Sequence, residues 1–411
     1  MAKFIRFAEQ VAYWGIVGIP FSIAIAPAFT SALVGITMVF FLAKWVAGGV
    51  RNYKGSAIDL AFLALLGISL VSIVNAVSLE ASIKGILKYC QYAMIFIILI
   101  AEVKDKLHIK RMVLSMALGG VLASVDAGWQ IAFGKDFIRG NLPIINIGLM
   151  RASAAFPNAN GLGVYLAPLA PFVIGLALYN LKGKAKVATL IAGLLIVVGI
   201  VMTWSRPAAL GCFLALLIMG IVRRDKVLLS ILVALLAISP IIAPRSIKQW
   251  AKDVNYNPIV FMCNSDRMSM YRNTMNMISH HPVIGVGLSN FSRSYHKYKL
   301  YEPENAITGD SVYAHNNFLH TAGEVGLLGL AALLWLLFAL FKKNISIYRK
   351  LKDPQLAVLS LCLIAALAAY LINGLTETNL YYARLVPLFW YLVGFSLALE
   401  KFIPRPEIQS H

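Results

Sequence analysis

The sequence predicts an all-α protein that crosses a membrane many times. Of its 411 residues, 59% are hydrophobic and only 13% are charged, which is more apolar than the core of a water-soluble protein requires. Apolar runs of about twenty residues recur along the chain, and this is the length that a helix needs to cross a bilayer. The runs lack strand-like alternation and are too long for barrel strands, so the membrane is expected to be crossed by helices.

About twelve transmembrane helices are expected on this basis. Their approximate bounds are 9–27, 29–48, 56–76, 83–103, 109–133, 160–180, 187–204, 207–222, 226–243, 316–341, 355–375 and 380–399. A second apolar run follows the first almost at once, without a small-residue cleavage site, so the first is not a cleaved signal peptide. The chain therefore divides into helices 1–9 over residues 1–243, a polar segment over residues 244–315, and helices 10–12 with a C-terminal tail over residues 316–411.

Basic residues are shared unequally between the two sets of connections. Lys and Arg gather in one set, so we expect both termini in the cytoplasm and the segment 244–315 on the outer side, because long loops cross membranes largely regardless of charge. This asymmetry also explains the net charge of +19. No basic stretch resembles a nucleic-acid module, and Gly285-Val-Gly287 is too short for a dinucleotide fingerprint. We expect neither nucleic acid nor nucleotide as a partner.

Several arginines break the charge pattern by standing on the outer side. They are Arg151, Arg206, Arg267, Arg272, Arg293 and Arg384. Few carboxylates accompany them, namely Asp253, Asp266, Glu302, Glu304, Asp310 and Glu377. Planar guanidinium groups suit phosphate oxygens, so the cluster favours an anion site. The alternative is that each arginine reaches lipid headgroups or closes a local ion pair.

Arg206 has the clearest local setting of these arginines. It lies where a new helix begins, with Ser205 suited to the N-cap and Pro207 to the first turn. Arg206 would add a full charge to the free N–H groups and the positive dipole end of that helix, which together bind phosphate well.

Residues 265–280 predict an amphipathic helix that lies along the membrane surface or covers a cavity. Its apolar residues recur at helical spacing: Met268, Tyr271, Met275 and Ile278. His281-Pro282 is expected to end this helix.

His315 is the candidate catalytic base, because imidazole can accept a proton near neutral pH. It ends the polar segment, on the same side of the membrane as the arginines. A lone histidine is more often structural. The position of His315, on the same side as the arginines, is what favours a catalytic role. His320 would face another side of the same helix and pack. The outer side offers no Asp-x-Asp pair, His-x-x-x-His pattern or clustered carboxylates, so we expect no metal and no cofactor, with arginines in place of a divalent ion.

Two motifs resemble those of O-antigen ligases. The first is Arg206-x-x-x-Leu210, and the second is His315-Asn316 followed by nine residues and Gly326-Leu-Leu-Gly329. Residues 151–160 and 281–291 also resemble stretches of the wider ligase and polymerase superfamily.

The resemblance implies a GT-C-like helical bundle with a large periplasmic loop between helices 9 and 10. It also implies a metal-independent, inverting glycosyltransferase of the bacterial inner membrane. Such enzymes complete lipopolysaccharide by transferring O-antigen polysaccharide from undecaprenyl diphosphate to a sugar hydroxyl of lipid A-core, on the periplasmic side. The residues that would act in catalysis are His315, Arg206 and Arg267. Those that would bind diphosphate or acceptor are Arg151, Asn316, Arg272 and Arg384.

Two alternatives stay open at this point. An O-antigen polymerase, or a related O-oligosaccharyltransferase, would share the donor, the fold and the arginines. A non-enzymatic transporter of lipid-linked glycan should carry ionisable residues deep in several helices, and we find mainly Asp126 there.

Overall fold

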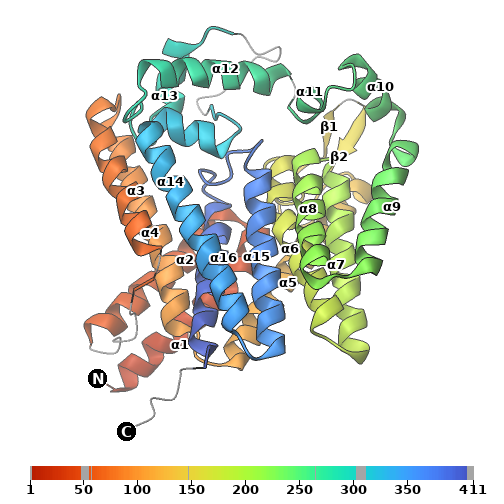
Figure 1. The fold of residues 1–411 in the computed structure, drawn as a ribbon. Helices are drawn as coiled ribbons and strands as arrows, with labels where there is room; N and C mark the ends of the chain where they lie inside the picture. The colour runs from red at the N-terminus through yellow and green to blue at the C-terminus, as the bar shows by residue number, and fades with distance from the viewer. Residues whose placement is uncertain are drawn as a thin grey trace.

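The structure, a computed structural model, describes residues 2–47, 55–56, 58–146, 148–263, 265–301 and 312–404. Three of the outward carboxylates, Glu302, Glu304 and Asp310, lie outside the described residues. The described chain forms a bundle of long helices, covered at one end by a layer of short ones (Figure 1).

The bundle helices are α1 (Ala2–Ile25), α2 (Pro27–Val46), α3 (Asp59–Ser72), α4 (Leu79–Glu102), α5 (Lys106–Phe133), α6 (Ala159–Tyr179), α7 (Gly183–Thr203), α8 (Arg206–Arg223), α9 (Lys226–Ile242), α14 (Asn317–Lys350), α15 (Pro354–Asn373) and α16 (Val386–Ala398). The short helices are α10 (Arg245–Asp253), α11 (Pro258–Met262), α12 (Ser265–His280) and α13 (Phe291–Tyr295). A hairpin of β1 (Ile144–Asn146) and β2 (Leu149–Arg151) is antiparallel, with Ile144 opposite Arg151. The 3-10 turns η1 (Ile73–Asn75), η2 (His296–Tyr298) and η3 (Leu399–Phe402) complete the described elements.

The chain is an all-α polytopic membrane protein. Within the described residues, nine helices are long and apolar enough to cross a membrane, and there are ten if α9 and α10, which are bent by 88° relative to each other, count as one span. Each predicted apolar run coincides with a helix of the bundle. Two of these helices are short, since α3 with η1 spans Asp59–Asn75 and α16 has 13 residues. The number of twelve crossings therefore stays a prediction.

The helices α6, α15 and α16 form the centre of the bundle, where almost every side chain is buried. By contrast, α9 lies at the edge, and only its Leu228 and Leu232 are buried. Figure 1 shows α10–α13 at the upper end of the bundle, whereas α1 begins and α16 ends at the lower end. The predicted polar segment and the chain termini thus lie at opposite ends.

The connection between α12 and α13 fastens the short helices to the bundle. The N–H of Gly287 donates to the carbonyl of Glu324 in α14 at 2.8 Å. Gly285 (φ +68°) lies so close to Glu324 that a Cβ would collide with its carbonyl group. At the kink of α14, a Cβ on Gly326 (φ +74°) would collide with the backbone of Val283. Both positions therefore require glycine, and the covering layer is held rigidly on α14.

The helix α12 has the predicted bounds but a different buried face. Its buried side chains are Arg267, Met270, Asn273, Thr274 and Met277, whereas Met275 of the predicted apolar face is 61% exposed. The face buried against the bundle differs from the predicted apolar face because it includes polar residues that find partners. Asn273, for example, donates to the hydroxyl of Tyr295 at 2.7 Å, and a buried polar group that is hydrogen-bonded is tolerated.

Candidate active site

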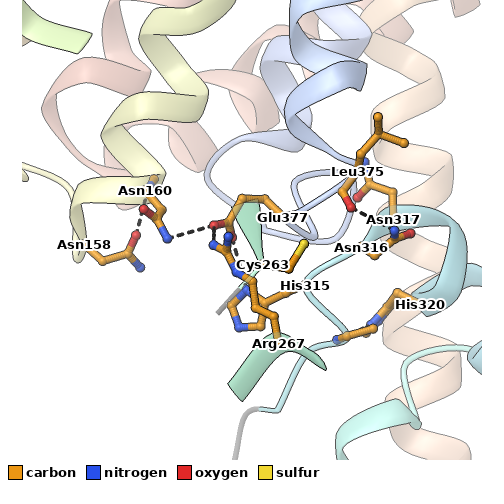
Figure 2. A network of polar contacts seen from close by, with 12 residues as sticks. Asn158, Asn160, Cys263, Arg267, His315, Asn316, Asn317, His320, Leu375 and Glu377 are labelled. Carbon is orange, nitrogen blue, oxygen red and sulfur yellow. Dashed lines mark hydrogen bonds and ion pairs between the residues drawn. The ribbon is translucent and has the colours of Figure 1, made fainter. Parts of the chain in front are cut away.

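Glu377, in the connection between α15 and α16, joins several of the predicted site residues (Figure 2). Its Oε1 forms an ion pair with the guanidinium of Arg267 and accepts a hydrogen bond from Asn160 Nδ2 at 2.8 Å. Its Oε2 lies 3.2 Å from Nδ1 of His315. The side chains of Arg267 and Glu377 are each only 11% exposed. One carboxylate therefore holds together the predicted base and a predicted phosphate-binding arginine.

The charge of Glu377 is maintained by its neighbours. Burial alone would raise the pKa of this carboxyl, but Arg267, His315 and Arg151 together lower the pKa below its usual value of 4.5. Glu377 is therefore ionised at neutral pH and balances part of the positive charge around it. Sequence reasoning placed Glu377 on the outer side but did not identify its partners.

Glu377→Gln is expected to destabilise the protein at neutral pH and much less in acid. A lowered pKa means that the carboxylate contributes stability above pH 4.5 and loses that contribution as the pH falls through its pKa in the folded protein. The melting temperature of the variant should be roughly 5 °C lower than that of the wild type at pH 7, and the two should converge below pH 4.5. Thermal scans in detergent measure this. A difference that is the same at every pH would contradict the assigned charge.

His315 is presented by an unusual backbone conformation. Its φ is +48°, which is uncommon for any residue other than glycine. The carbonyl of His315 accepts a hydrogen bond from the hydroxyl of Tyr271 in α12 at 3.0 Å. The next residue, Asn316, is the N-cap of α14, and its Oδ1 accepts from two N–H groups of the first turn. Its Nδ2 donates to the carbonyl of Leu375 at 2.8 Å. Both the oxygen and the nitrogen of the Asn316 side-chain amide are therefore hydrogen-bonded to backbone groups. Asn316 thus positions His315 by fixing the backbone beside it.

Arg206 begins α8, as predicted, with Pro207 in the first turn. Ser205 stands at the N-cap position, as predicted, but its buried hydroxyl makes no capping hydrogen bond. The guanidinium of Arg206 lies 4.0 Å from the ring centre of Trp250 in α10, a distance that gives a cation–π contact. It also donates to the carbonyl of Phe261 in α11.

The carboxyl end of α11 brings Arg206 and Arg267 together. Arg267 donates to the carbonyl of Met262 at 3.4 Å, and the preceding carbonyl, that of Phe261, accepts from Arg206. Arg151 reaches the same region from β2. Its Nη2 donates at 2.7 Å to Oδ1 of Asn160, whose Nδ2 contacts Glu377.

These arginines make the site short of negative charge. Burial lowers the pKa of Arg151, the charge of Arg267 lowers it further, and Glu377 opposes the change. Arg206 lies beside Arg267, since the two guanidinium groups donate to neighbouring carbonyls at the end of α11. Arg267 pairs with Glu377 directly, and Arg151 reaches it through Asn160. An anionic ligand would therefore relieve the repulsion among the three guanidinium groups.

The structure does not bring Arg272 or Arg384 to Glu377. Arg272 is exposed on α12, with its guanidinium 5.2 Å from the ring centre of Tyr301. Arg384 is buried, and it donates to the carbonyl of Ile23 at 3.0 and 2.8 Å and to that of Ala155 at 2.7 Å. Its guanidinium is therefore occupied in joining α1 to the segment before α6. His320 is only 2% exposed and packs against aromatic rings, which confirms the packing role predicted for it.

A cavity of about 270 Å³ lies beside His315 and Glu377. Its polar lining includes Asn158, Thr378 and the hydroxyls of Tyr313 and Tyr382, and no arginine lines it. The described residues contain no group of three or more His, Cys, Asp or Glu side chains that could hold a metal ion.

Residues 191–334 match the family model described as O-antigen ligase. Over those residues the chain is similar to O-antigen ligases. The match confirms the resemblance, and it contains Arg206, Arg267 and His315, whereas Arg151 and Glu377 lie outside it. O-antigen ligase family members are membrane glycosyltransferase-like enzymes that act as ligases or polymerases. No curated protein gives a significant match to the chain.

Proposed function

We propose that this protein is an O-antigen ligase of the bacterial inner membrane. It would transfer O-antigen polysaccharide from undecaprenyl diphosphate to a sugar hydroxyl of lipid A-core and so complete lipopolysaccharide. The observation that carries the proposal is the meeting of Arg267 and His315 at Glu377, with Arg206 beside Arg267 at the end of α11. The chain also matches the O-antigen ligase family model over residues 191–334.

The arginines are suited to the diphosphate of the donor. Diphosphate is a good leaving group once its charge is held, and fixed guanidinium groups hold it in the transition state without a general acid. Arg267 and Arg206 would contact the phosphates directly, and Arg151 would add charge from the side of Asn160. In the donor-free site, Glu377 is the counter-charge of Arg267. The diphosphate would take over that role when it binds.

His315 is suited to activate the acceptor. Its Nδ1 faces Glu377, which leaves Nε2 free to accept the proton of the acceptor hydroxyl. The hydroxyl oxygen would attack the anomeric carbon of the donor sugar from the side opposite the diphosphate. The bond from that carbon to the phosphate oxygen breaks, its electron pair leaves on the diphosphate, and the configuration is inverted. Glu377 would stabilise the protonated imidazole after the transfer.

The distribution of lysines supports a periplasmic site. A cavity of about 870 Å³ is lined by Lys104, Lys343, Lys350 and Lys401. Lys350 ends α14, whereas His315 lies just before α14 begins, so this cavity is at the other end of the bundle. Basic residues favour the cytoplasmic end of a membrane protein, so Glu377 and its arginines would face the periplasm.

The transporter alternative gains little from the structure. Oδ1 of Asp126, the ionisable group noted within a predicted span, accepts a hydrogen bond from the N–H of Phe137 at 2.8 Å and holds the following loop. The base beside an anion site also has no role in transport. An O-antigen polymerase would use the same residues, and the products formed in cells distinguish it.

Deletion of the gene is expected to abolish smooth lipopolysaccharide and to cause long lipid-linked polymer to accumulate. The polymer still forms in such a strain, but nothing transfers it to lipid A-core. Gel analysis of lipopolysaccharide and extraction of lipid-linked glycans measure the two products. A strain that instead makes lipid A-core with single repeat units, and no long polymer, would identify a polymerase. Restoration by the wild-type gene is the control.

A further inference from the structure

The cavity beside His315 contains polar groups that the mechanism above does not use. Thr378 is only 6% exposed, and its Oγ1 is buried without a hydrogen-bond partner. Tyr313 and Tyr382 also line the cavity. Oδ1 of Asn158 accepts from the N–H of Gly161 at 2.7 Å and caps α6, which leaves its Nδ2 available. A buried hydroxyl without a partner costs free energy, so a ligand that bonds to it would be favoured.

The chemistry of this cavity differs from that of the arginine cluster. Hydroxyl groups, an amide and tyrosine rings suit the hydroxyls and the apolar face of a sugar ring. No arginine or lysine lines the cavity, and the carboxylate of Glu377 does. A phosphate group placed there would lie against the carboxylate of Glu377, and the guanidinium of Arg267 is already paired with this carboxylate. The lining therefore selects a neutral sugar and disfavours a phosphorylated one.

The volume limits the ligand to about one ring. Pockets that hold drug-sized molecules measure roughly 300–1,000 Å³, and this cavity of about 270 Å³ lies just below that range. Because His315 lines the cavity, a hydroxyl of the bound ring would lie beside the base, with Glu377 between the ring and Arg267.

We propose that this cavity binds the acceptor sugar of lipid A-core as a single neutral, non-phosphorylated ring. The proposal rests on the proposed function, because it takes His315 as the base. Thr378, Tyr313, Tyr382 and Asn158 then hold the ring, and the arginines hold the diphosphate of the donor. The charged diphosphate of the donor and the neutral sugar of the acceptor would thus bind to different groups of the same site.

The test is Thr378→Val in purified protein, with Thr376→Val as the matched control. Both threonines have a buried hydroxyl without a partner, but only Thr378 lines the cavity. Valine keeps the shape, and loss of an unpaired buried hydroxyl should not impair folding. Thr378→Val is expected to raise KM for a neutral acceptor glycolipid about tenfold and to leave KM for the lipid-linked donor unchanged. Thr376→Val should leave both unchanged.

A binding measurement gives a second readout that does not depend on turnover. Saturation-transfer NMR with the methyl glycoside of a neutral hexose should show binding to the wild type, and weaker binding to Thr378→Val. The 6-phosphate of the same glycoside should bind more weakly to the wild type.

Three outcomes would overturn the acceptor assignment. They are a rise in donor KM instead of acceptor KM, equal behaviour of the two threonine variants, and tighter binding of the phosphorylated glycoside. The first would mean that the cavity holds the reducing-end sugar of the donor. Any of these results with wild-type transfer intact would leave the proposed ligase function standing. Absence of transfer by the wild type would instead remove the proposed function, and with it the acceptor role.

Discussion

His315→Ala is expected to lower the rate of transfer by about 10²–10⁴-fold, the range typical of a lost general base. Binding of the lipid-linked donor should be unchanged, because Arg206, Arg267 and Arg151 stay in place. The measurements are initial rates with purified protein in lipid nanodiscs and titration of the donor into the same sample.

His296→Ala is the matched control for this substitution. His296 lies in the same outer layer but is exposed in η2, so its loss should leave both rate and donor binding unaltered. Transfer by His315→Ala within tenfold of the wild type would exclude His315 as the base. A variant that lost donor binding as well as turnover would point to a structural role for the turn at His315.

Arg267→Lys is expected to lower the rate about 10²–10³-fold, as is usual when one donor to a developing negative charge is lost. Lysine keeps the positive charge but presents it as a point, whereas the fork of Arg267 reaches both Glu377 and the carbonyl of Met262. The fork would present a similar pair of donors to diphosphate oxygens. Rates at saturating donor, together with KM for the donor, measure the effect.

Arg272→Lys serves as the control, because Arg272 lies on the same helix with its guanidinium exposed. It should reduce transfer little or not at all. Equal losses of activity in the two variants would mean that the arginines of α12 have a role other than phosphate binding, such as contact with lipid headgroups. An unaltered rate in Arg267→Lys would remove Arg267 from the phosphate site.

The positions of the helices could be predicted from the sequence because they depend on local properties. Runs of apolar residues mark the bundle, and His281-Pro282 marks the end of α12. The face that α12 buries could not be predicted in this way, because Arg267 and Asn273 are buried through partners far away in the chain. Sequence periodicity counts apolar residues and does not register a polar group whose partner is distant.

The composition of the site could be predicted in part. Charge alone placed the arginines on the outer side, but it did not distinguish Arg267, paired with Glu377, from Arg384, whose guanidinium is occupied by carbonyls of α1 and Ala155. The role of Glu377 was also missed. It lies in a short connection 62 residues after His315, and only the packing of α15 against α6 and α14 brings the two side chains together.

The glycine contacts between the outer layer and α14 would restrict how the two proposed lipid-anchored substrates reach His315. Because Gly285 and Gly326 seat the layer directly on α14, lifting α12 from the bundle would break backbone contacts as well as side-chain packing. The edge helix α9 and the helix α10, which meet at a bend of 88°, are far less tightly enclosed. The proposed polymer substrate is therefore expected to enter the site beside Trp250, whose ring covers Arg206.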